Sequence, residues 1–408
     1  MKAGILMSFI KWITSFFMAI SMFFSSIFGL FSKPGPNVEP PVEEPRTLIC
    51  GVCHPDDDSV QIKNAGLGWV RIDIPYPYNK NGSISAAYTA FKSRAKAFAE
   101  QGVKVLGITP YPRHYLSTGG FDPSTDENAQ RTKDIAVFLC SDLRDVIGGL
   151  QITNEMNLSK FASPLTLEQA AKFIGFQAQV LSEVKGDLII GYNSAGIGEN
   201  LHALMQPYLP YMDYVGVDLY FGTHGDGTLQ DFVSGVREIN RLTGKPVILT
   251  EFGFPGAGEP KSVQERAAVL ARYGYESEEA ARADIESFIE KLPEAFKSNV
   301  YQTYPDPAQW GDAVFKKWRT HFYGYIDCSI PGIPHTPEGQ AEFYWQLIPL
   351  LKTTDCLAGF FIFRWQDSGV CSGCGQADCP FKSAWGLLDK NGEPKPAYYA
   401  VSEAIAAE

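Results

Sequence analysis

Eight short apolar runs, separated by segments with helical spacing of apolar residues, constrain the fold of this 408-residue chain more than any other feature. Strands that alternate with helices in this way predict a parallel β/α architecture. Eight units favour a closed (β/α)8 TIM barrel over an open doubly wound sheet, and no Gly-rich dinucleotide loop follows the first run. The predicted strands are residues 48–52, 69–74, 103–108, 149–153, 188–192, 214–220, 247–250 and 359–363.

The segments between the predicted strands carry helix signals. Apolar periodicity predicts helices at 86–101 and 127–147. Thr166 begins a Thr-Leu-Glu-Gln pattern, which is typical of a capping box at the start of a helix. Thr228 and the Thr336-Pro337 pair are similar start signals.

The interval between the seventh and eighth predicted strands is far longer than one β/α unit needs. Residues 262–273 and 278–296 have helical patterns, and residues 301–325 are rich in aromatic side chains. A long helical, aromatic-rich insertion is therefore expected at about 256–335. It either shapes a ligand cleft or covers the side of the barrel.

The N-terminal segment differs in kind from the rest of the chain. Residues 12–31 are apolar apart from Ser and Thr, and ~20 such residues are enough to span a bilayer. Lysines flank the run, so residues 1–33 are expected to be an uncleaved signal anchor or a cleaved signal peptide. Both interpretations place the chain outside the cytoplasm, anchored to a membrane or secreted. Residues 34–46 form a Pro- and Glu-rich linker, and the folded domain is expected at 47–408.

The charge balance excludes one class of partner. A net charge of −11 leaves no basic stripe to neutralise nucleic-acid phosphates or to bind anionic lipid broadly. Aromatic residues make up 13% of the chain. They suit a cleft for the flat apolar faces of sugar rings, although core packing accounts for most of them. Because of the negative net charge, nucleic acid is not an expected partner. The oligomeric state is left open.

Two carboxylates closely follow predicted buried strands. Glu155 comes two residues after the fourth strand, and Glu251 comes directly after the seventh. Each alone reads as an ordinary strand-end carboxylate, solvated or capping the next helix. Together they are harder to dismiss, because the reacting groups of a β/α barrel sit at the carboxyl ends of its strands. A pair of carboxylates at one site is the equipment for hydrolysing a glycosidic bond.

Several short motifs share these positions at strand ends. They are Arg71 in WVRIDIPY, Asn154-Glu155 in TNE, Tyr220 in GVDLYFG, Glu251 in LTEFG, Trp365 in FFIFRWQD, and the closing run 385–399. As a set they resemble the clan A glycoside hydrolases, which are retaining (β/α)8 enzymes that include families 5, 39 and 53. The resemblance covers about residues 48–401, and each motif alone is weak.

The resemblance implies a role for each matched residue. Glu155 would be the acid/base with a raised pKa, and Glu251 the ionised nucleophile, with a gap of ~5–5.5 Å between the carboxylates. Asn154 would bind the sugar 2-hydroxyl, Arg71 and Tyr220 would hold Glu251, and Trp365 would form the floor under the reacting sugar. In the alternative, Arg71 is a structural ion-pair partner, and Tyr220 and Trp365 are core aromatics.

Other residues just past predicted strands are candidates for substrate contacts. These are His54, Tyr111, His114 and Asn193. Trp310 and Trp385 either line outer subsites or pack in the core.

The cysteines give a second signal. Cys371, Cys374 and Cys379 lie in a Gly-rich loop after the eighth predicted strand, and Cys356 lies just before it. Four such residues form a structural zinc site, form disulfides, which an extracytoplasmic location favours, or remain free thiols. Cys50 and Cys53 are three apart in one strand and point to opposite faces, and Cys140 is expected in the core. No ligand set for a catalytic metal and no other cofactor is expected.

Two functions are consistent with these patterns. The first is a retaining glycoside hydrolase that cleaves β-glycosidic bonds in a poly- or oligosaccharide by double displacement. The second is a non-catalytic carbohydrate-binding or surface-display protein on a barrel scaffold. The presence of Asn154, Glu155 and Glu251 favours the enzyme.

Overall fold

The computed structural model describes residues 47–55, 58–377 and 379–407. The described residues from Leu48 onward form one compact unit. The predicted signal segment and the Pro/Glu-rich linker lie outside the described residues, so the membrane anchor and the extracytoplasmic location stay predictions. Within the described ranges, no helix has both the length and the apolar character needed to cross a membrane.

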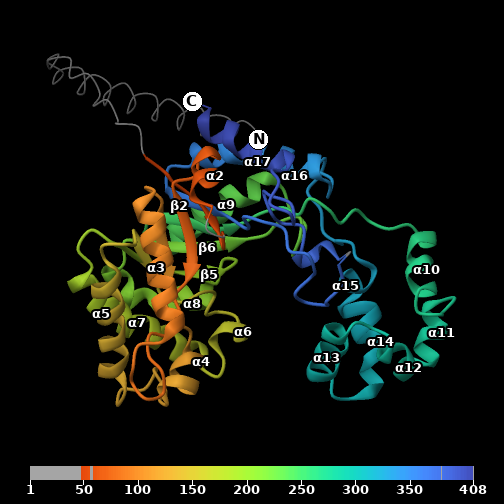
Figure 1. The fold of residues 1–408 in the computed structure, drawn as a ribbon, viewed down its shortest axis with the longest axis horizontal. Coiled ribbons are helices and arrows are strands. Elements are labelled where there is room, and N and C mark those ends of the chain that lie inside the picture. Colours follow the sequence, from red (N-terminus) through yellow and green to blue (C-terminus); the bar gives the residue numbers. More distant parts are fainter. Residues whose placement is uncertain (1–46, 56–57, 378, 408) are drawn as a thin grey trace, which may run out of the picture. The chain divides into compact units, whose positions relative to one another are not determined.

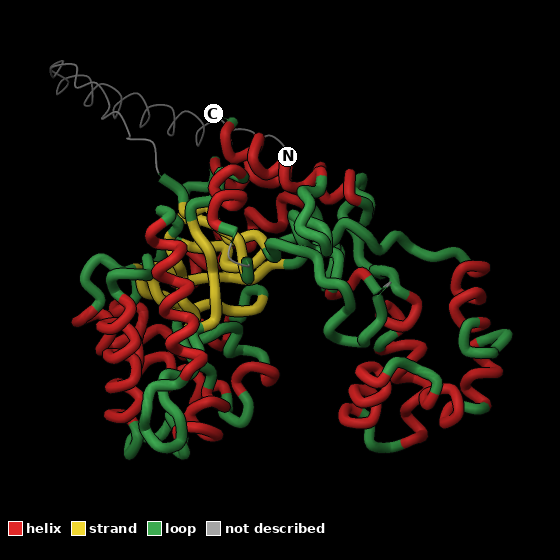
Figure 2. The backbone as a smooth tube through the Cα atoms, viewed as in Figure 1, coloured by secondary structure: helices red, strands yellow, loops and turns green. Residues whose placement is uncertain are grey.

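Eight parallel strands close into a barrel in sequence order, with β8 pairing back onto β1 (Figure 2). The predicted (β/α)8 TIM barrel and all eight predicted strand positions are confirmed. The strands are β1 (Ile49–Cys53), β2 (Trp69–Asp73), β3 (Lys104–Ile108), β4 (Gly149–Gln151), β5 (Ile189–Ala195), β6 (Tyr214–Leu219), β7 (Val247–Phe252) and β8 (Leu357–Ile362).

Alternate residues of each strand face two separate cores. Leu106, Ile248 and Phe361 pack with one another inside the barrel. Their neighbours Val105 and Leu249 point outward into a larger core. This alternation follows from the two-residue period of a strand. Each fully buried aliphatic or aromatic side chain of this kind contributes ~1.5–3 kcal/mol to stability.

Helices surround the strands and begin at the predicted signals (Figure 1). The Thr166 capping box is present, with the Gln169 side chain accepting from the Thr166 N–H at 2.9 Å. At Thr336 the hydroxyl accepts from the Gly339 N–H at 3.1 Å. The longer barrel helices are α3 (Ala86–Glu100), α5 (Ala129–Leu143), α7 (Leu167–Val184), α9 (Leu229–Thr243), α16 (Pro337–Lys352) and α17 (Pro396–Ala406). The shorter ones are α2 (Ser59–Asn64), α4 (Pro112–His114), α6 (Ser159–Ala162) and α8 (Glu199–Met205).

The predicted helical insertion follows β7 and has a core of its own. Its aromatic residues pack against one another, with Phe288, Phe315 and Phe322 at the centre. The aromatic richness of this segment is therefore largely internal packing. Its helices are α10 (Val263–Ala271), α11 (Glu278–Ala283), α12 (Ile285–Glu290), α13 (Glu294–Thr303), α14 (Trp310–Asp312) and α15 (Arg319–Tyr323).

Candidate active site

A cavity of about 630 Å³ opens at the carboxyl ends of the barrel strands. This is the volume range of small-molecule sites. Glu155 and Glu251 both line it, as do residues that follow most of the other strands. The polar and charged residues of the lining are His54, Asp73, Tyr111, Asn154, Glu155, Lys160, Asp218, Tyr220, His224, Glu251 and Lys382.

Both oxygens of the Glu251 carboxylate receive a short hydrogen bond. Arg71 Nη1 donates to Oε1 at 2.6 Å, and the Tyr220 hydroxyl donates to Oε2 at 2.5 Å. Burial alone would raise the pKa of Glu251, but the charge of Arg71, together with His54 and the Tyr220 bond, outweighs burial and lowers it. Glu251 is therefore held as a carboxylate and is fixed in orientation.

Arg71 uses all sides of its guanidinium in the barrel interior. It is fully buried. Besides the bond to Glu251, Nε donates to Gln151 Oε1 at 2.7 Å and Nη2 donates to Asn154 Oδ1 at 2.5 Å. The rigid fork of arginine matches several acceptors at once, which lysine cannot do. Arg71 is thus an ion-pair partner and also the link between Asn154 and Glu251.

The environment of Glu155 is the opposite of that of Glu251. Asn154 Nδ2 donates to Glu155 Oε2 in a long hydrogen bond of 3.4 Å, whereas Glu251 receives two short ones. Burial raises the pKa of Glu155, and the negative charge of Glu251 raises it further, to about 7 despite the opposing charge of Arg71. Glu155 therefore holds a proton near neutral pH while Glu251 does not.

Three residues at the ends of β1 and β4 have left-handed backbone conformations that non-glycine residues rarely adopt. Their φ angles are 48° at His54, 60° at Thr153 and 47° at Glu155. Each such conformation costs ~1–3 kcal/mol and is typical of functional sites. At Glu155 the backbone N–H donates to Asn193 Oδ1 at 2.9 Å, which holds the turn in place.

The amide of Asn154 is oriented by its neighbours. Its Oδ1 accepts from Arg71, from Gln151 Nε2 at 3.3 Å and from Asn193 Nδ2 at 2.9 Å. Because these donors occupy the oxygen, the Nδ2 group is left to face the cavity that Asn154 lines. Asn193, which was predicted to touch substrate, does not line the cavity but supports Asn154 and Glu155 from below, at 1% exposure.

Asp218 is a third buried carboxyl that sequence reasoning missed. It accepts from Thr250 Oγ1 at 2.6 Å and from Asn193 Nδ2 at 2.8 Å. Burial and the charge of Glu251 raise the pKa of Asp218 well above its ordinary value. The signal was an acidic residue inside an apolar strand, two positions before Tyr220 and so on the same face.

A bulge in β7 brings two consecutive residues to the interior. Leu249 pairs with Val217, but Asp218 pairs with Glu251, so the register shifts by one residue. Thr250 bonds Asp218, and Glu251 also reaches the cavity. In a regular strand these neighbours would point to opposite faces, and bulges next to active sites commonly re-aim a side chain in this way.

The placement of Trp365 differs from the prediction that it forms the floor of the site. It is 1% exposed, belongs to the main hydrophobic core, packs against Tyr398 and does not line the cavity. The strand ends at Ile362, so the side chain that faces the cavity is that of Phe363. Trp385 packs edge-on against Tyr220, with ring centroids 5.3 Å apart, and so supports the site from behind.

The remaining candidates divide between the cavity and its surroundings. His54 and Tyr111 line the cavity, and the Tyr111 hydroxyl donates to Asp73 Oδ1 at 2.9 Å. His114 lies in α4, packs edge-on against Tyr111 and does not line the cavity. Trp310 lies in the insertion, where its indole N–H donates to the Tyr304 carbonyl. Lys160 and Lys382 line the cavity and were not predicted.

One member of the predicted four-cysteine cluster is wrong. Cys371, Cys374 and Cys379 lie together, but their fourth neighbour is His321 and not Cys356. The Cys356 sulfur lies 4.0 Å from the Val236 carbonyl, just before β8. In the described part of the chain, Cys371, Cys374 and Cys379 are not joined by disulfides. Cys140 is buried in the core as predicted.

No family model and no curated protein sequence matches the chain. Solved structures do match. The family 53 glycoside hydrolase catalytic domain of Ignisphaera aggregans aligns over 91% of this chain and 99% of its own, at 16% identity and TM-score 0.52. A family 39 glycoside hydrolase from Bacteroides cellulosilyticus aligns over 88% of this chain and 64% of its own, at 16% identity and TM-score 0.53.

A fungal β-1,4-galactanase aligns over 85% of this chain and 90% of its own, at 13% identity and TM-score 0.54. Identities this low carry information about fold alone. The chain therefore shares the (β/α)8 barrel fold of these glycoside hydrolase structures.

Proposed function

We propose that this protein is a retaining glycoside hydrolase acting on β-linked sugars. The observation that carries the proposal is the contrast between two carboxyl groups in one cavity. Glu155 has a pKa of about 7, and Glu251 has a pKa below its ordinary value. Environments that push two carboxyl pKa values apart assign one group as acid and the other as nucleophile or stabiliser.

The reaction proceeds in two steps on these groups. In the first, Glu251 attacks the anomeric carbon while Glu155 gives its proton to the leaving oxygen, so a glycosyl ester forms as the glycosidic bond breaks. Loss of the Glu251 negative charge lowers the pKa of Glu155. In the second, Glu155 accepts a proton from water, and the resulting hydroxide displaces Glu251 from the same carbon. The product retains its anomeric configuration.

The neighbouring residues position these two groups. Arg71 and Tyr220 aim the Glu251 carboxylate and keep it ionised. Asn154 offers the second hydrogen of its Nδ2 group to a sugar hydroxyl, with its amide oxygen held by Arg71 and Asn193. Hydrogen bonds that are already in place before the substrate arrives need no reorganisation in the transition state.

The comparisons and the charge of the cavity support a β-linked glycan, neutral or acidic, as the substrate. One matched structure is a β-1,4-galactanase, and another is a Bacteroides uniformis β-glucuronidase at 14% identity and TM-score 0.52. Lys160 and Lys382 line the cavity. Burial lowers the pKa of Lys382 most, and repulsion from the charge of Lys160 lowers it further. A sugar carboxylate would relieve that repulsion, so acidic sugars belong in the substrate panel beside neutral β-glycans.

The test is hydrolysis followed by a proton NMR spectrum. The full-length protein is incubated with β-linked glucans, mannans, xylans, galactans and uronic-acid oligosaccharides. The expected result is release of reducing ends whose first-formed anomer is β. A 2-deoxy-2-fluoro glycoside of the active sugar should add one glycosyl mass to the peptide that contains Glu251. A first-formed α anomer would contradict retention.

The alternative is a carbohydrate-binding protein without turnover. It predicts that the parent and Glu251→Gln bind a glycan equally well and that neither releases reducing ends. That outcome replaces the enzyme proposal.

The raised pKa of Glu155 predicts a basic limb in the activity profile. An acid catalyst must be protonated, so kcat/KM is expected to fall about tenfold per pH unit above pH about 7. With an aryl glycoside whose leaving group needs no protonation, Glu155→Gln should retain the first step. Its kcat/KM should then show no basic limb. A basic limb unchanged in Glu155→Gln would show that another group titrates there.

A further inference from the structure

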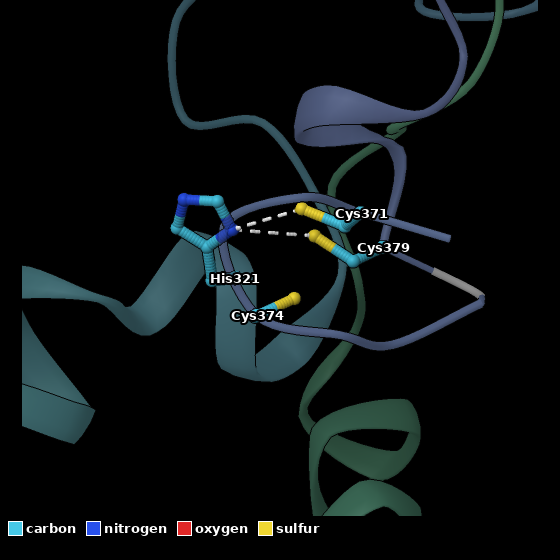
Figure 3. Close-up of side chains that lie close together, drawn as sticks. All are labelled: His321, Cys371, Cys374 and Cys379. Carbon is cyan, nitrogen blue, oxygen red and sulfur yellow. Dashed lines mark hydrogen bonds between the residues drawn. The ribbon is translucent and has the colours of Figure 1, made fainter. Parts of the chain in front are cut away.

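Four potential metal ligands lie together outside the catalytic cavity. They are His321 in α15 and three cysteines in the loop after β8, Cys371, Cys374 and Cys379 (Figure 3). His321 Nδ1 lies 3.5 Å from the Cys371 sulfur and 3.5 Å from the Cys379 sulfur. All four ligand atoms lie within 4.8 Å of one another, and the three cysteines are buried.

These distances fit a single tetrahedral ion. Ligands at ~2.0 Å for nitrogen and ~2.3 Å for sulfur lie about 3.5–3.8 Å apart when they share one tetrahedral metal. The two nitrogen–sulfur distances have this value. Only Nδ1 of the imidazole faces the sulfurs, as Figure 3 shows, which is the arrangement of a histidine that ligates through one nitrogen.

The surrounding backbone holds the ligands in this arrangement. The Gln376 side chain donates to the His321 carbonyl at 2.8 Å, and the Gly375 N–H donates to the Cys371 carbonyl at 2.8 Å. At Gly373 a Cβ atom would lie 2.8 Å from His321 Cε1, so only glycine lets the loop approach the ring this closely. The loop is thus shaped around the cluster.

We propose that His321, Cys371, Cys374 and Cys379 bind one structural zinc ion. Three thiolates and one imidazole in a tetrahedron are a ligand set that zinc prefers. Four protein ligands leave no open position for water, so the site is structural and not catalytic. The proposal is independent of the glycosidase assignment, because its evidence lies wholly in these four residues.

The zinc ion ties the insertion to the wall of the catalytic cavity. His321 belongs to α15 of the insertion, and the cysteines belong to the loop that leads from β8. Two residues after Cys379, Phe381 packs against His321, with ring centroids 4.7 Å apart, and against His224 of the cavity lining at 5.2 Å. Lys382 then lines the cavity itself. Loss of zinc should therefore loosen this part of the wall.

The test begins with metal analysis of the full-length protein, produced in zinc-supplemented cells and purified without a metal-affinity tag. We expect about one zinc per chain, the stoichiometry of a four-ligand site. Cys374→Ser should lose the zinc, while Cys328→Ser and Cys356→Ala, which change cysteines outside the cluster, should keep it. Cobalt exchanged into the parent should give the thiolate charge-transfer and d–d bands of a tetrahedral site.

The rate of trypsin cleavage measures how readily this part of the cavity wall opens. Cleavage after Lys382 should be on the order of tenfold faster in Cys374→Ser than in the parent, because the loop opens without the metal. Cleavage after the exposed Lys390 serves as the internal reference. If Cys374→Ser does not fold, the parent's metal content and cobalt spectrum decide. A metal-free parent, or a disulfide between two of the three cysteines in alkylated, unreduced protein, would overturn the zinc site.

Discussion

Glu251→Gln is expected to reduce kcat on the cleaved substrate by on the order of 10⁴–10⁶-fold, the range found when a member of a catalytic unit is removed. The amide cannot form a glycosyl ester, although it keeps the shape of the side chain. Binding of the glycan should persist, because the other residues that line the cavity are unchanged. Steady-state kinetics and calorimetric glycan binding measure the two effects separately.

Two further variants make this result specific. Glu238→Gln changes a partly exposed glutamate on α9 that accepts a hydrogen bond from Arg241 at the surface, and it should retain parental activity. Glu251→Ala should regain turnover of an activated aryl glycoside when azide is added, with an α-glycosyl azide as product. Azide enters from the face that the carboxylate vacates. If Glu251→Gln kept the parental activity, Glu251 would not be the nucleophile.

Arg71→Met is expected to destabilise the protein by about 3–5 kcal/mol, the usual effect of removing one partner of a buried ion pair. It leaves Tyr220 as a hydrogen-bond donor to Glu251 and deprives Gln151 and Asn154 of a donor. Activity should also fall by roughly 10²–10³-fold, because Glu251 is no longer held ionised and aimed. Urea unfolding and kcat/KM measure the two losses.

The pH dependence identifies the cause of the instability. Arg71 holds the pKa of Glu251 low, so in the parent this carboxylate adds stability that is present above its unfolded pKa and is lost as pH falls. In Arg71→Met the Tyr220 bond and the His54 charge still oppose burial, but the largest opposing charge is gone, so the pKa of Glu251 rises and the folded protein binds more protons. The stability deficit should therefore grow from pH 5 to pH 8. Arg241→Met, which removes an exposed ion pair with Glu238, should leave stability near the parental value at both pH values. A deficit independent of pH would indicate lost packing instead.

The strands and the two carboxylates were predictable because their signals are local. A strand covered on both faces must be a short apolar run, and a residue directly after such a run lies at the carboxyl end of the barrel. Glu155 and Glu251 met both conditions. The start of α7 was equally local, since a capping box involves residues only three apart.

Trp365, Asp218 and Lys382 show where local signals fail. Trp365 was assigned by motif position, but β8 ends three residues earlier and the chain then turns its side chain into the core. Asp218 lies inside an apolar strand, and only the folded structure shows its hydrogen bonds to Thr250 and Asn193. Lys382 reaches the cavity only because the cysteine loop returns the chain to it.

The sequence by itself determined the eight β/α units, the insertion after the seventh strand and the two carboxylates at strand ends, because each depends on residues a few positions apart. Only the tertiary structure decided that Thr250 and Glu251 both face the interior, since this needs the register shift between β6 and β7. It also decided that His321 joins Cys371, 50 positions away, and that Cys356 does not. Spacing reveals ligands that share one loop, whereas a ligand from a distant helix is brought in only when the insertion packs against that loop.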